Sequence, residues 1–454
     1  MVYGPGGKRV PVTTPVPEAL GQACAAVRPA AEADAVAGVT PSWVARPAST
    51  DELSAVLAAA AGLNLASVPR GAGTKLAWGR PPDRCDLVVD MLGLDQVLEH
   101  EAGDLVARVQ AGIRISELAA ALGRAGQELA LDVPSQPASG NGDGDGGRGT
   151  VGGVLATGLA GPRRLRFGTP RDLTIGITMV RADGQIAHSG GKVVKNVAGY
   201  DLGKLLAGSY GTLGVIAEAA FRLHPVPAAA AWVTATADGP GDGAAAAQRL
   251  MAAAADSPLA PSAAELDRPV RGAPVRAAVL LEGDPDGVTE RAGQLRGLLA
   301  AAGGTDVAVS DAPPPWWGQA GVASPEETLI RIAFWAAELG EVTRAVDDAA
   351  AAAGVDPALG GSAAAGVMHA RLPAAAEPAA VAGFVTALRA ARPLAGTGEA
   401  PPARGSAVVL HAPPAVMAAV DVWGPVPAAA LMRAVKDQFD PARRLSPGRF
   451  AAGI

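Results

Sequence analysis

The chain has 454 residues, 49% of them hydrophobic and 18% charged, and it carries a formal net charge of −6. This length and composition are typical of a globular protein with two or three domains, and they exclude a disordered chain. A surface that binds nucleic acid would need a basic face, so the acidic balance argues against DNA or RNA as a partner.

The two cysteines and the start of the chain bear on the compartment. Cys24 and Cys85 form neither a C-x-x-C pair nor a disulfide framework, which favours a reduced, cytoplasmic setting. The first eight residues lack the apolar core of an export signal, and no apolar run of about 18 residues follows. We therefore expect no transmembrane segment, and we expect any association with the inner face of a membrane to occur through partners.

The first half of the chain alternates between helical and extended patterns. Ser49 followed by Asp51 and Glu52 is typical of a capped helix with acidic groups in its first turn. The expected elements, in chain order, are a helical patch at 18–27, a helix starting at 49–52, strands at 65–68, 87–90 and 105–111, a helix at 115–125, and a hairpin of strands 172–181 and 185–189. This alternation is α/β in character.

The second half is richer in Ala and Pro but keeps its periodicity. Its β–α units predict a second domain, a sheet with helices on one face. The expected elements are strands at 277–283, 307–310 and 328–334 and helices at 288–302, 341–352 and 431–438. After the last helix, Pro and Gly fix a tight return.

Glycine is concentrated in three segments where an apolar pattern would otherwise continue. They are residues 69–75 (Pro-Arg-Gly-Ala-Gly-Thr-Lys), 150–158 and 190–216. Backbone without Cβ atoms can approach a flat or anionic group closely. Together the three segments predict one large, elongated cofactor that carries phosphate. Taken alone, the glycines of 69–75 are equally compatible with a phosphate-binding nest and with a simple turn.

Other nucleotide and metal motifs are incomplete. Leu76 stands where a Rossmann G-x-G-x-x-G would need its third glycine, which disfavours a nicotinamide cofactor. Asn141, Asp143 and Asp145 have the opening spacing of a calcium loop, but Gly152 replaces the bidentate Glu that such a loop requires. Calcium is therefore not expected, and the role of the Gly/Asp loop 139–149 stays open.

Three of the six lysines lie close together. Lys192, Lys195 and Lys204 are compatible with solvated loop charge or with contact to a phosphate or a partner. Gly203-Lys204 is followed by Leu205 rather than by the Ser or Thr of a P-loop, so ATP binding is rejected. The five histidines form no H-x-x-H or H-x-x-x-H pair, and we expect no metal.

Several motifs resemble, in order along the chain, the FAD-binding motifs of the vanillyl-alcohol oxidase/p-cresol methylhydroxylase (PCMH) flavoproteins. They are found at residues 69–75, 150–158, 167–172, 195–201, 208–216 and 439–449. Within that family the strongest likeness is to the FAD-binding subunits of glycolate oxidase (glycolate dehydrogenase), through residues 158–164 and Ser209-Tyr-Gly211. The larger flavin subunit usually has Glu in place of Tyr210.

The resemblance implies an α+β fold. A two-subdomain PCMH-type FAD-binding fold would be joined to a C-terminal α+β cap domain with an antiparallel sheet. The domains implied are an N-terminal arm over 1–40, the FAD-binding domain over 41–227, the cap over 228–430, and a return segment over 431–454 that packs on the FAD-binding domain.

The resemblance also implies the residues that hold non-covalent FAD. Residues 70–75 would wrap the pyrophosphate, Gly152, Gly153 and Ala156 would line the ribityl and ring region, and residues 214–216 would meet the adenine side. Arg171 and Asp172 would fix the strand behind the cofactor. The full predicted set is Pro69, Arg70, Gly71, Ala72, Gly73, Thr74, Lys75, Pro134, Thr150, Gly152, Gly153, Ala156, Gly158, Arg171, Asp172, Gly211, Gly214, Val215 and Ile216.

The implied function is that of an FAD-binding subunit in a glycolate (2-hydroxyacid) dehydrogenase complex. Its partners would be a larger flavin subunit and an iron–sulfur subunit, and its substrate a small 2-hydroxyacid such as glycolate. The second half offers only His369 and His411 and no Glu-His motif, so we assign no catalytic residue. Two alternatives stay open: a scaffold subunit with structural or no FAD, and a self-sufficient flavin oxidase.

Overall fold

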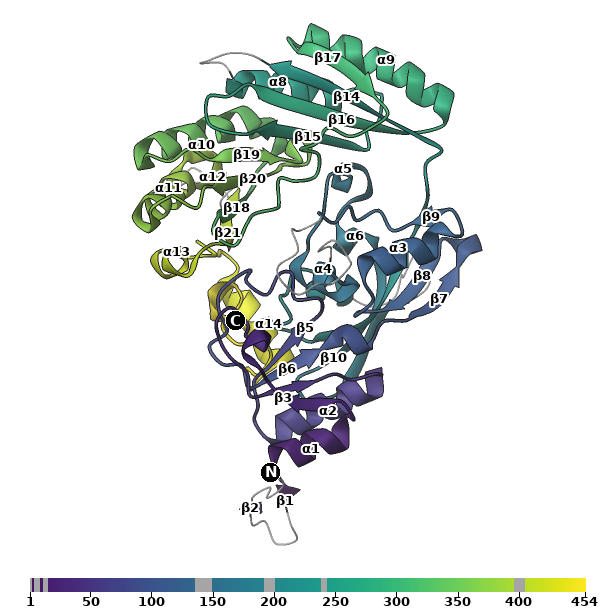
Figure 1. Ribbon diagram of the computed structural model, residues 1–454, viewed down its shortest axis with the longest axis vertical. Coiled ribbons are helices and arrows are strands. Elements are labelled where there is room, and N and C mark those ends of the chain that lie inside the picture. The colour runs from purple at the N-terminus through teal and green to yellow at the C-terminus, as the bar shows by residue number, and fades with distance from the viewer. Residues whose placement is uncertain are drawn as a thin grey trace.

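A computed structural model describes residues 15–134, 149–191, 201–237, 243–395 and 405–454, together with the backbone of two short strands, β1 (Val2–Tyr3) and β2 (Arg9–Val10). Three main sheets follow one another along the chain. In Figure 1 the first two lie in the lower half of the molecule and the third at the top, and α14 and the C-terminus return to the lower half.

The first sheet has the strand order β3-β4-β6-β5. The strands are β3 (Val27–Pro29), β4 (Trp43–Ala45), β5 (Ser67–Arg70) and β6 (Leu87–Asp90). β4 and β5 both run parallel to β6, so their carboxyl ends meet at one edge. Because β3 pairs with β4, the segment predicted as an N-terminal arm contributes a strand to this sheet.

Two helices, α1 (Val16–Ala23) and α2 (Thr50–Gly62), pack on this sheet. The predicted cap of α2 is present, since the Ser49 hydroxyl accepts a hydrogen bond from the Glu52 amide at 3.1 Å. Leu53, Val56 and Leu57 are buried in a cluster that also holds residues of the second sheet. The first two sheets therefore share one core across α2.

The second sheet is antiparallel and has the order β11-β10-β12-β8-β7. The strands are β7 (Val97–Glu101), β8 (Val106–Gln110), β10 (Thr174–Val180), β11 (Ile186–Gly190) and β12 (Val215–Arg222), with a separate small pair, β9 (Gln127–Glu128) and β13 (His224–Pro225). The helices are α3 (Ile115–Gly123), α4 (Val151–Thr157), α5 (Arg164–Phe167), α6 (Pro170–Leu173) and α7 (Gly203–Leu206). The predicted hairpin is β10–β11.

The third sheet, which we call the cap sheet, is antiparallel throughout and has the order β17-β14-β16-β15-β19-β20-β18-β21. Its strands are β14 (Ala229–Ala237), β15 (Ala263–Arg268), β16 (Val275–Gly283), β17 (Thr305–Ser310), β18 (Thr328–Ala333), β19 (Ala358–Gly361), β20 (Val367–Leu372) and β21 (Ser406–His411). Its helices are α8 (Gly243–Ala255), α9 (Pro285–Ala301), α10 (Leu339–Ala353), α11 (Pro378–Ala390), α12 (Arg392–Ala395) and α13 (Pro414–Ala419).

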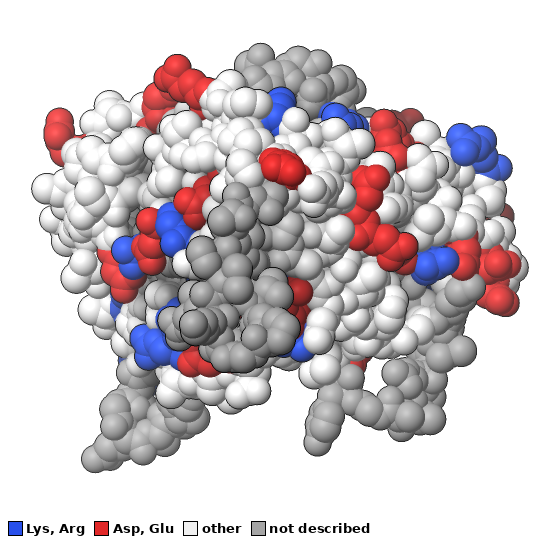
Figure 2. Space-filling model, turned by 90° about the horizontal axis from the view of Figure 1, so that it is seen from below, with Lys and Arg blue, Asp and Glu red and all other residues white. Residues whose placement is uncertain are grey.

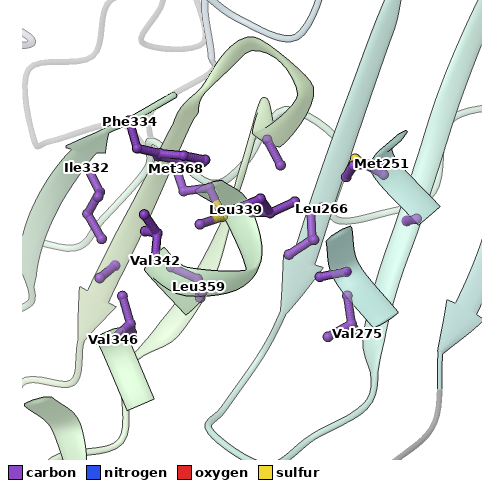
Figure 3. Close-up of a cluster of buried hydrophobic side chains, with 14 of the residues drawn as sticks. Met251, Leu266, Val275, Ile332, Phe334, Leu339, Val342, Val346, Leu359 and Met368 are labelled. Carbon is purple, nitrogen blue, oxygen red and sulfur yellow. The ribbon is translucent and has the colours of Figure 1, made fainter. Parts of the chain in front are cut away.

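The two faces of the cap sheet differ. One face packs against α8 to α11 through an apolar core, in which Leu266, Ile332 and Met368 from the strands meet Leu339 and Val342 from α10 (Figure 3). Neighbouring positions on the same strands project to the other face. That face carries Leu329 and Val408, which belong to an apolar cluster built mainly from the second sheet and its helices.

The chain ends in a return segment that is fastened to the first two sheets. Lys436 of α14 (Ala429–Phe439) is fully buried, and its Nζ donates to Thr212 O at 2.6 Å, to Leu445 O at 3.0 Å and to Asp440 Oδ2 at 2.7 Å. The backbone of Ser67 on β5 also pairs with Leu445. The return segment thus fixes β5 and the turn at Thr212 relative to each other.

The described residues include no helix with the length and apolar character needed to cross a lipid bilayer. On the face of the molecule seen in Figure 2, Lys and Arg lie singly or beside Asp and Glu, and they form no continuous basic surface among the residues described there.

Candidate functional site

A pocket lies where the carboxyl end of β5, the first turns of α4 and the turn before β12 meet. It encloses about 900 Å³ free of protein atoms, including space open to solvent. It is lined by Pro69, Arg70, Gly71, Ala72, Gly73, Thr74, Lys75, Leu76, Met91, Ala111, Gly149, Thr150, Gly152, Gly153, Val154, Ala156, Thr157, Leu159, Tyr210, Gly211, Gly214, Val215, Ile216 and Arg449. We call it the glycine-walled pocket.

The loop after β5 brings backbone donors to this pocket. Within the described residues, the amides of Ala72, Gly73, Thr74 and Lys75 have no hydrogen-bond acceptor. A Cβ on Gly71 would overlap the Oγ1 atom of Thr150, so only glycine lets the loop lie this close to α4. Unpaired amides in such a loop are typical of an anion-binding nest.

Arg70 does not supply the positive charge of this loop. Its guanidinium donates to Asp34 Oδ1 at 2.9 Å and to Asp90 Oδ2 at 3.3 Å. Asp34 is buried and also accepts two hydrogen bonds from Arg28, which holds the pKa of the Asp34 carboxyl well below its usual range. The Arg70 side chain therefore fastens the end of β5 to its neighbours, and its charge is balanced by protein carboxylates.

Lys75 is the cation of the loop that has no counter-charge. Its Nζ is buried, has no hydrogen-bond partner within the described residues, and lies 5.4 Å from the centre of the Trp78 ring. Burial lowers the Lys75 pKa to about 8. A buried ammonium without an anion is costly, so this position is prepared for an anionic ligand.

The second glycine segment forms a short helix rather than a loop. Thr150 begins α4, and its hydroxyl accepts a hydrogen bond from the Gly153 amide at 3.3 Å. The Gly152 amide donates to Ala111 O at 2.7 Å, and a Cβ on Gly152 would lie 2.9 Å from the Ala111 Cβ. Small residues here let α4 lie directly against the end of β8 beside the pocket.

The third segment closes the pocket with a turn and a strand. The Tyr210 amide donates to Ala156 O at 2.8 Å, and Tyr210 has a positive φ of 56°. Gly211 follows at φ 72°, where a Cβ would meet the Pro69 ring at 2.8 Å. Gly214, directly before β12, and Val215 and Ile216, its first two residues, also line the pocket.

Arg449, from the return segment, lies in the wall of the pocket. It is buried, and its guanidinium donates to Leu76 O at 2.7 Å and to Trp78 O at 2.8 Å. Burial lowers the Arg449 pKa to about 10. Beside it, Tyr210 packs against Trp423 with ring centres 5.2 Å apart and against Phe450 at 5.5 Å. Three distant segments of the chain thus close one end of the pocket.

Most of the predicted FAD-binding residues line this pocket, and four do not: Pro134, Gly158, Arg171 and Asp172. Gly158 ends α4 in the left-handed conformation. Arg171 is exposed, and Asp172 caps α6 by accepting a hydrogen bond from the Thr169 amide at 2.8 Å. Pro134 is buried at the last described position before residue 135.

Sequence reasoning missed the remaining lining residues, which are Leu76, Met91, Ala111, Gly149, Val154, Thr157, Leu159, Tyr210 and Arg449. Tyr210 and Arg449 belong to the motifs at 208–216 and 439–449, but the sequence did not predict that these two residues line the pocket. Met91 directly follows the predicted strand 87–90, and Ala111 is the last residue of the predicted strand 105–111; residues at strand ends often contact ligands in α/β folds.

Some predictions fall on residues outside the described part of the chain. These are Lys192, Lys195 and most of the motif at 195–201, and the Gly/Asp loop from 139 to 148. Lys204 is described. Lys204 is on α7, its Nζ lies 3.6 Å from Asp201 Oδ2, and it does not line the glycine-walled pocket.

Comparison with known proteins identifies the domain that carries the pocket. Residues 41–190 match the family described as "FAD binding domain". These residues are an FAD-binding domain. The match confirms the predicted cofactor, and we therefore call the glycine-walled pocket the flavin pocket. The pocket fits FAD, because unpaired amides and a buried, unpartnered ammonium can meet a pyrophosphate, while walls without Cβ atoms admit a flat ring.

Three curated relatives illustrate the similarity in sequence. The chain is 37% identical over 187 residues to the glycolate oxidase subunit GlcD of Bacillus subtilis, 37% over 182 residues to a D-lactate dehydrogenase of Archaeoglobus fulgidus, and 36% over 162 residues to the glycolate oxidase subunit GlcE of Escherichia coli. These matches cover 36% to 41% of this chain and 38% to 43% of the relatives' lengths. The predicted resemblance to glycolate oxidase subunits is thereby confirmed for the FAD-binding part.

Solved structures show the same fold over nearly the whole chain. p-Cresol methylhydroxylase with substrate bound superposes with a TM-score of 0.70 at 14% identity, over 97% of this chain and 96% of that one. An alkyldihydroxyacetonephosphate synthase gives 0.63 at 16% identity, over 90% of this chain and 76% of that one. The predicted fold, a PCMH-type FAD-binding fold with an antiparallel cap sheet, is confirmed.

Proposed function

We propose that this chain is the FAD-binding subunit of a 2-hydroxyacid dehydrogenase complex of the glycolate oxidase type. The sequence similarity to GlcE, GlcD and a D-lactate dehydrogenase supports an oxidoreductase of 2-hydroxyacids. The single structural observation that carries the proposal is the unpartnered Lys75 ammonium in a glycine-walled pocket of an FAD-binding domain.

The residues of the loop after β5 would hold the pyrophosphate of FAD. The free amides of 72–75 would donate to its oxygens, and Lys75 would balance one of its charges. Arg70 would act indirectly, because its bonds to Asp34 and Asp90 fix the backbone from which the loop departs.

The walls of the pocket would orient the ring and exclude water from it. α4 would support one side, while Tyr210 and Arg449 would close the cap side. Once bound, FAD would supply the hydride-accepting chemistry that amino-acid side chains lack, and it would pass the electrons to an acceptor. We propose a larger flavin subunit and an iron–sulfur subunit as the partners that receive them.

Reconstitution with FAD tests the proposal. The purified chain should be yellow or become yellow with FAD, and FAD should raise its melting temperature. Lys75→Ala should weaken FAD binding about tenfold or more, because a charge-assisted hydrogen bond contributes about 1.5–3 kcal/mol. Lys204→Ala is the matched control and should bind FAD like the unaltered chain.

The same preparation separates the alternatives. Reduction of the flavin by glycolate only after the partner subunits are added supports the subunit role. Reduction by the isolated chain, with oxygen as acceptor, would indicate a self-sufficient oxidase. A colourless chain that gains no stability from FAD contradicts the flavoprotein proposal and leaves the scaffold reading.

A further inference from the structure

The face of the cap sheet opposite its helices carries ionisable side chains that the flavin pocket does not use. Arg331 on β18 pairs directly with His369 on β20 and with Val408 on β21. Directly paired residues of antiparallel strands project to the same face. Val408 packs in the apolar cluster that includes the pocket residues Val154 and Leu159, so Arg331 and His369 also face the FAD-binding domain.

Arg164, on α5, approaches the same place from the FAD-binding domain. In Figure 1, α5 lies between the cap sheet and the lower half of the molecule. Arg163 and Arg166 connect α5 to the cap domain. The Arg163 guanidinium lies 3.2 Å from the Glu282 carboxylate on β16, and the Arg166 guanidinium donates to Ser262 Oγ at 3.4 Å. The Arg164 guanidinium lies within electrostatic reach of Glu265 on β15 and of Arg331 on β18, so it approaches the cap sheet.

These two guanidiniums lack carboxylate partners. Within the described residues the Arg331 guanidinium makes no hydrogen bond or ion pair, and the Arg164 guanidinium makes one hydrogen bond, from Nε to Gly161 O at 3.1 Å. The adjacent Arg163, by contrast, pairs with Glu128, Asp132 and Glu282. Two neighbouring cations at a partly buried junction repel each other unless an anion lies between them.

The carboxyl group of Glu265, which lies within electrostatic reach of Arg164, does not neutralise the two arginines. Glu265 on β15 is buried and accepts a hydrogen bond from Ser362 Oγ at 2.5 Å. Burial raises the Glu265 pKa to about 7, although Ser362 and Arg164 oppose the rise. At neutral pH this group is therefore only partly ionised, which leaves the two arginines with an excess of positive charge.

His369 adds an uncharged polar group to the same face of the cap sheet. Burial, together with Arg164 and Arg331, lowers the His369 pKa to about 3, so the imidazole is neutral at physiological pH. Its Nδ1 is buried and has no hydrogen-bond partner within the described residues. A neutral imidazole with a free nitrogen beside two cations can accept or donate one hydrogen bond to a ligand.

The cluster adjoins the flavin pocket through Tyr210. Tyr210 lines that pocket, and its phenol lies within electrostatic reach of both Arg331 and Arg449. Leu329, two residues before Arg331, belongs to the same apolar cluster as Tyr210. A small ligand held by Arg331 would therefore lie next to the cap-side wall of the flavin pocket.

We propose that Arg164 and Arg331 form a binding site for one small organic carboxylate, and that His369 binds a second polar group of the same ligand. A guanidinium pair matches the planar, charged fork of a carboxylate. The choice of a 2-hydroxyacid as the ligand rests on the proposed function, whereas the carboxylate site itself rests on the two unpartnered arginines.

Calorimetric titration of the FAD-loaded full chain with glycolate tests the site. Arg164→Gln and Arg331→Gln should each weaken glycolate binding at least tenfold. Arg371→Gln is the matched control: Arg371 lies two residues from His369 on β20 but is engaged by Glu327 at 3.5 Å and by Val322 O at 3.1 Å, so this variant should bind like the unaltered chain. Unchanged binding in both Gln variants overturns the proposal.

Probe chemistry provides a second, independent measurement on the unaltered chain. Glycolamide has the same shape as glycolate without its charge, and it should show no binding. If glycolamide or inorganic phosphate binds as tightly as glycolate, or if glycolate does not bind, the carboxylate site is wrong. Because this measurement uses the unaltered chain, it tests the carboxylate site even if a Gln variant fails to fold.

Failure of this site and failure of the proposed function give different results. A chain that binds glycolate through Arg164 and Arg331 but retains no FAD supports the site and contradicts the function. A yellow chain whose glycolate affinity is insensitive to both arginines supports the function and contradicts the site.

Discussion

The flavin pocket and the arginine cluster lie on either side of Tyr210 and are built by opposite means. The walls of the pocket are mostly backbone and small residues, brought together from β5, α4 and β12. The cluster consists of long polar side chains that project from a flat sheet face and from one short helix. A site made of backbone should be sensitive to added volume, whereas a site made of side chains should be sensitive to changed charge.

The largest expected effect tests what supports the backbone of the pocket. Lys436→Met leaves the buried Asp440 carboxylate without its ammonium and removes the hydrogen bond to Thr212 O next to Gly211. Breaking a buried pair in this way should cost about 3–5 kcal/mol of unfolding free energy, measured by denaturant titration.

The exposed pair of Asp437 and Arg443, on the same return segment, is the control. Asp437→Ala should change the unfolding free energy by less than about 1 kcal/mol. Equal effects of the two variants would show that burial of Lys436 does not fasten the return segment.

The next effect concerns added volume. Gly152→Ala places a Cβ 2.9 Å from the Ala111 Cβ and 3.0 Å from its carbonyl oxygen, so it should destabilise the chain by about 1–3 kcal/mol and weaken FAD retention. Gly123→Ala, also within a helix but with no atom within 4 Å, should stabilise by about 0.5–1 kcal/mol. Thermal melts of both variants check this difference in sign.

A smaller effect concerns the pH dependence of stability on the cluster side. The pKa of Glu265 is raised from 4.5 in the unfolded chain to about 7 when folded, so its contribution to stability is complete below pH 4.5 and is lost as the pH rises through 7. The slope is at most about 1.4 kcal/mol per pH unit. Ser362, Arg164, Asp132 and Asp267 are the groups that act on it.

Glu265→Gln isolates this contribution. Between pH 5 and pH 7.5 the unaltered chain should lose more stability than the variant, measured by urea unfolding at each pH. Parallel curves for the two proteins would show that the Glu265 carboxyl keeps its ordinary pKa in the folded chain.

The smallest expected effect is a gain in stability. Arg331→Met removes one of two repelling, unpartnered cations, and it should raise the unfolding free energy of the unliganded chain by about 0.5–1 kcal/mol. Arg371→Met removes an engaged arginine from the same face and should not stabilise. A melting temperature for Arg331→Met below that of the unaltered chain would indicate a partner for Arg331 in the folded protein.

The sequence predicted the pocket far better than the cluster, and the difference has a physical cause. Clustered glycine is visible in sequence because few other residues permit close backbone approach, and this signal marked Gly71, Gly152 and Gly211. Arg164, Arg331 and His369 are common residue types without diagnostic spacing. Only the strand register of the cap sheet brings Arg331 beside His369, and register depends on long-range pairing.

The secondary structure was likewise predicted better in the FAD-binding domain than in the cap. The strand predicted at 87–90 coincides with β6, and the hairpin at 172–189 with β10 and β11. In the cap, the sequence analysis did not predict β14, β15, β19, β20 or β21; the Ala and Gly residues of β14 and β19 give little alternation between apolar and polar positions. No helix was predicted at 150–158, because the glycines of this segment hide the helix α4 that Thr150 caps.

Arg449 has a consequence for how the protein is made. Its guanidinium holds the carbonyl of Leu76, which lies 373 positions earlier in the chain. During translation the glycine loop leaves the ribosome long before the segment that closes it, and at typical rates of about 5–20 residues per second that interval lasts tens of seconds. We expect nascent chains to capture FAD firmly only after the return segment has emerged, so cofactor loading follows the synthesis of that segment.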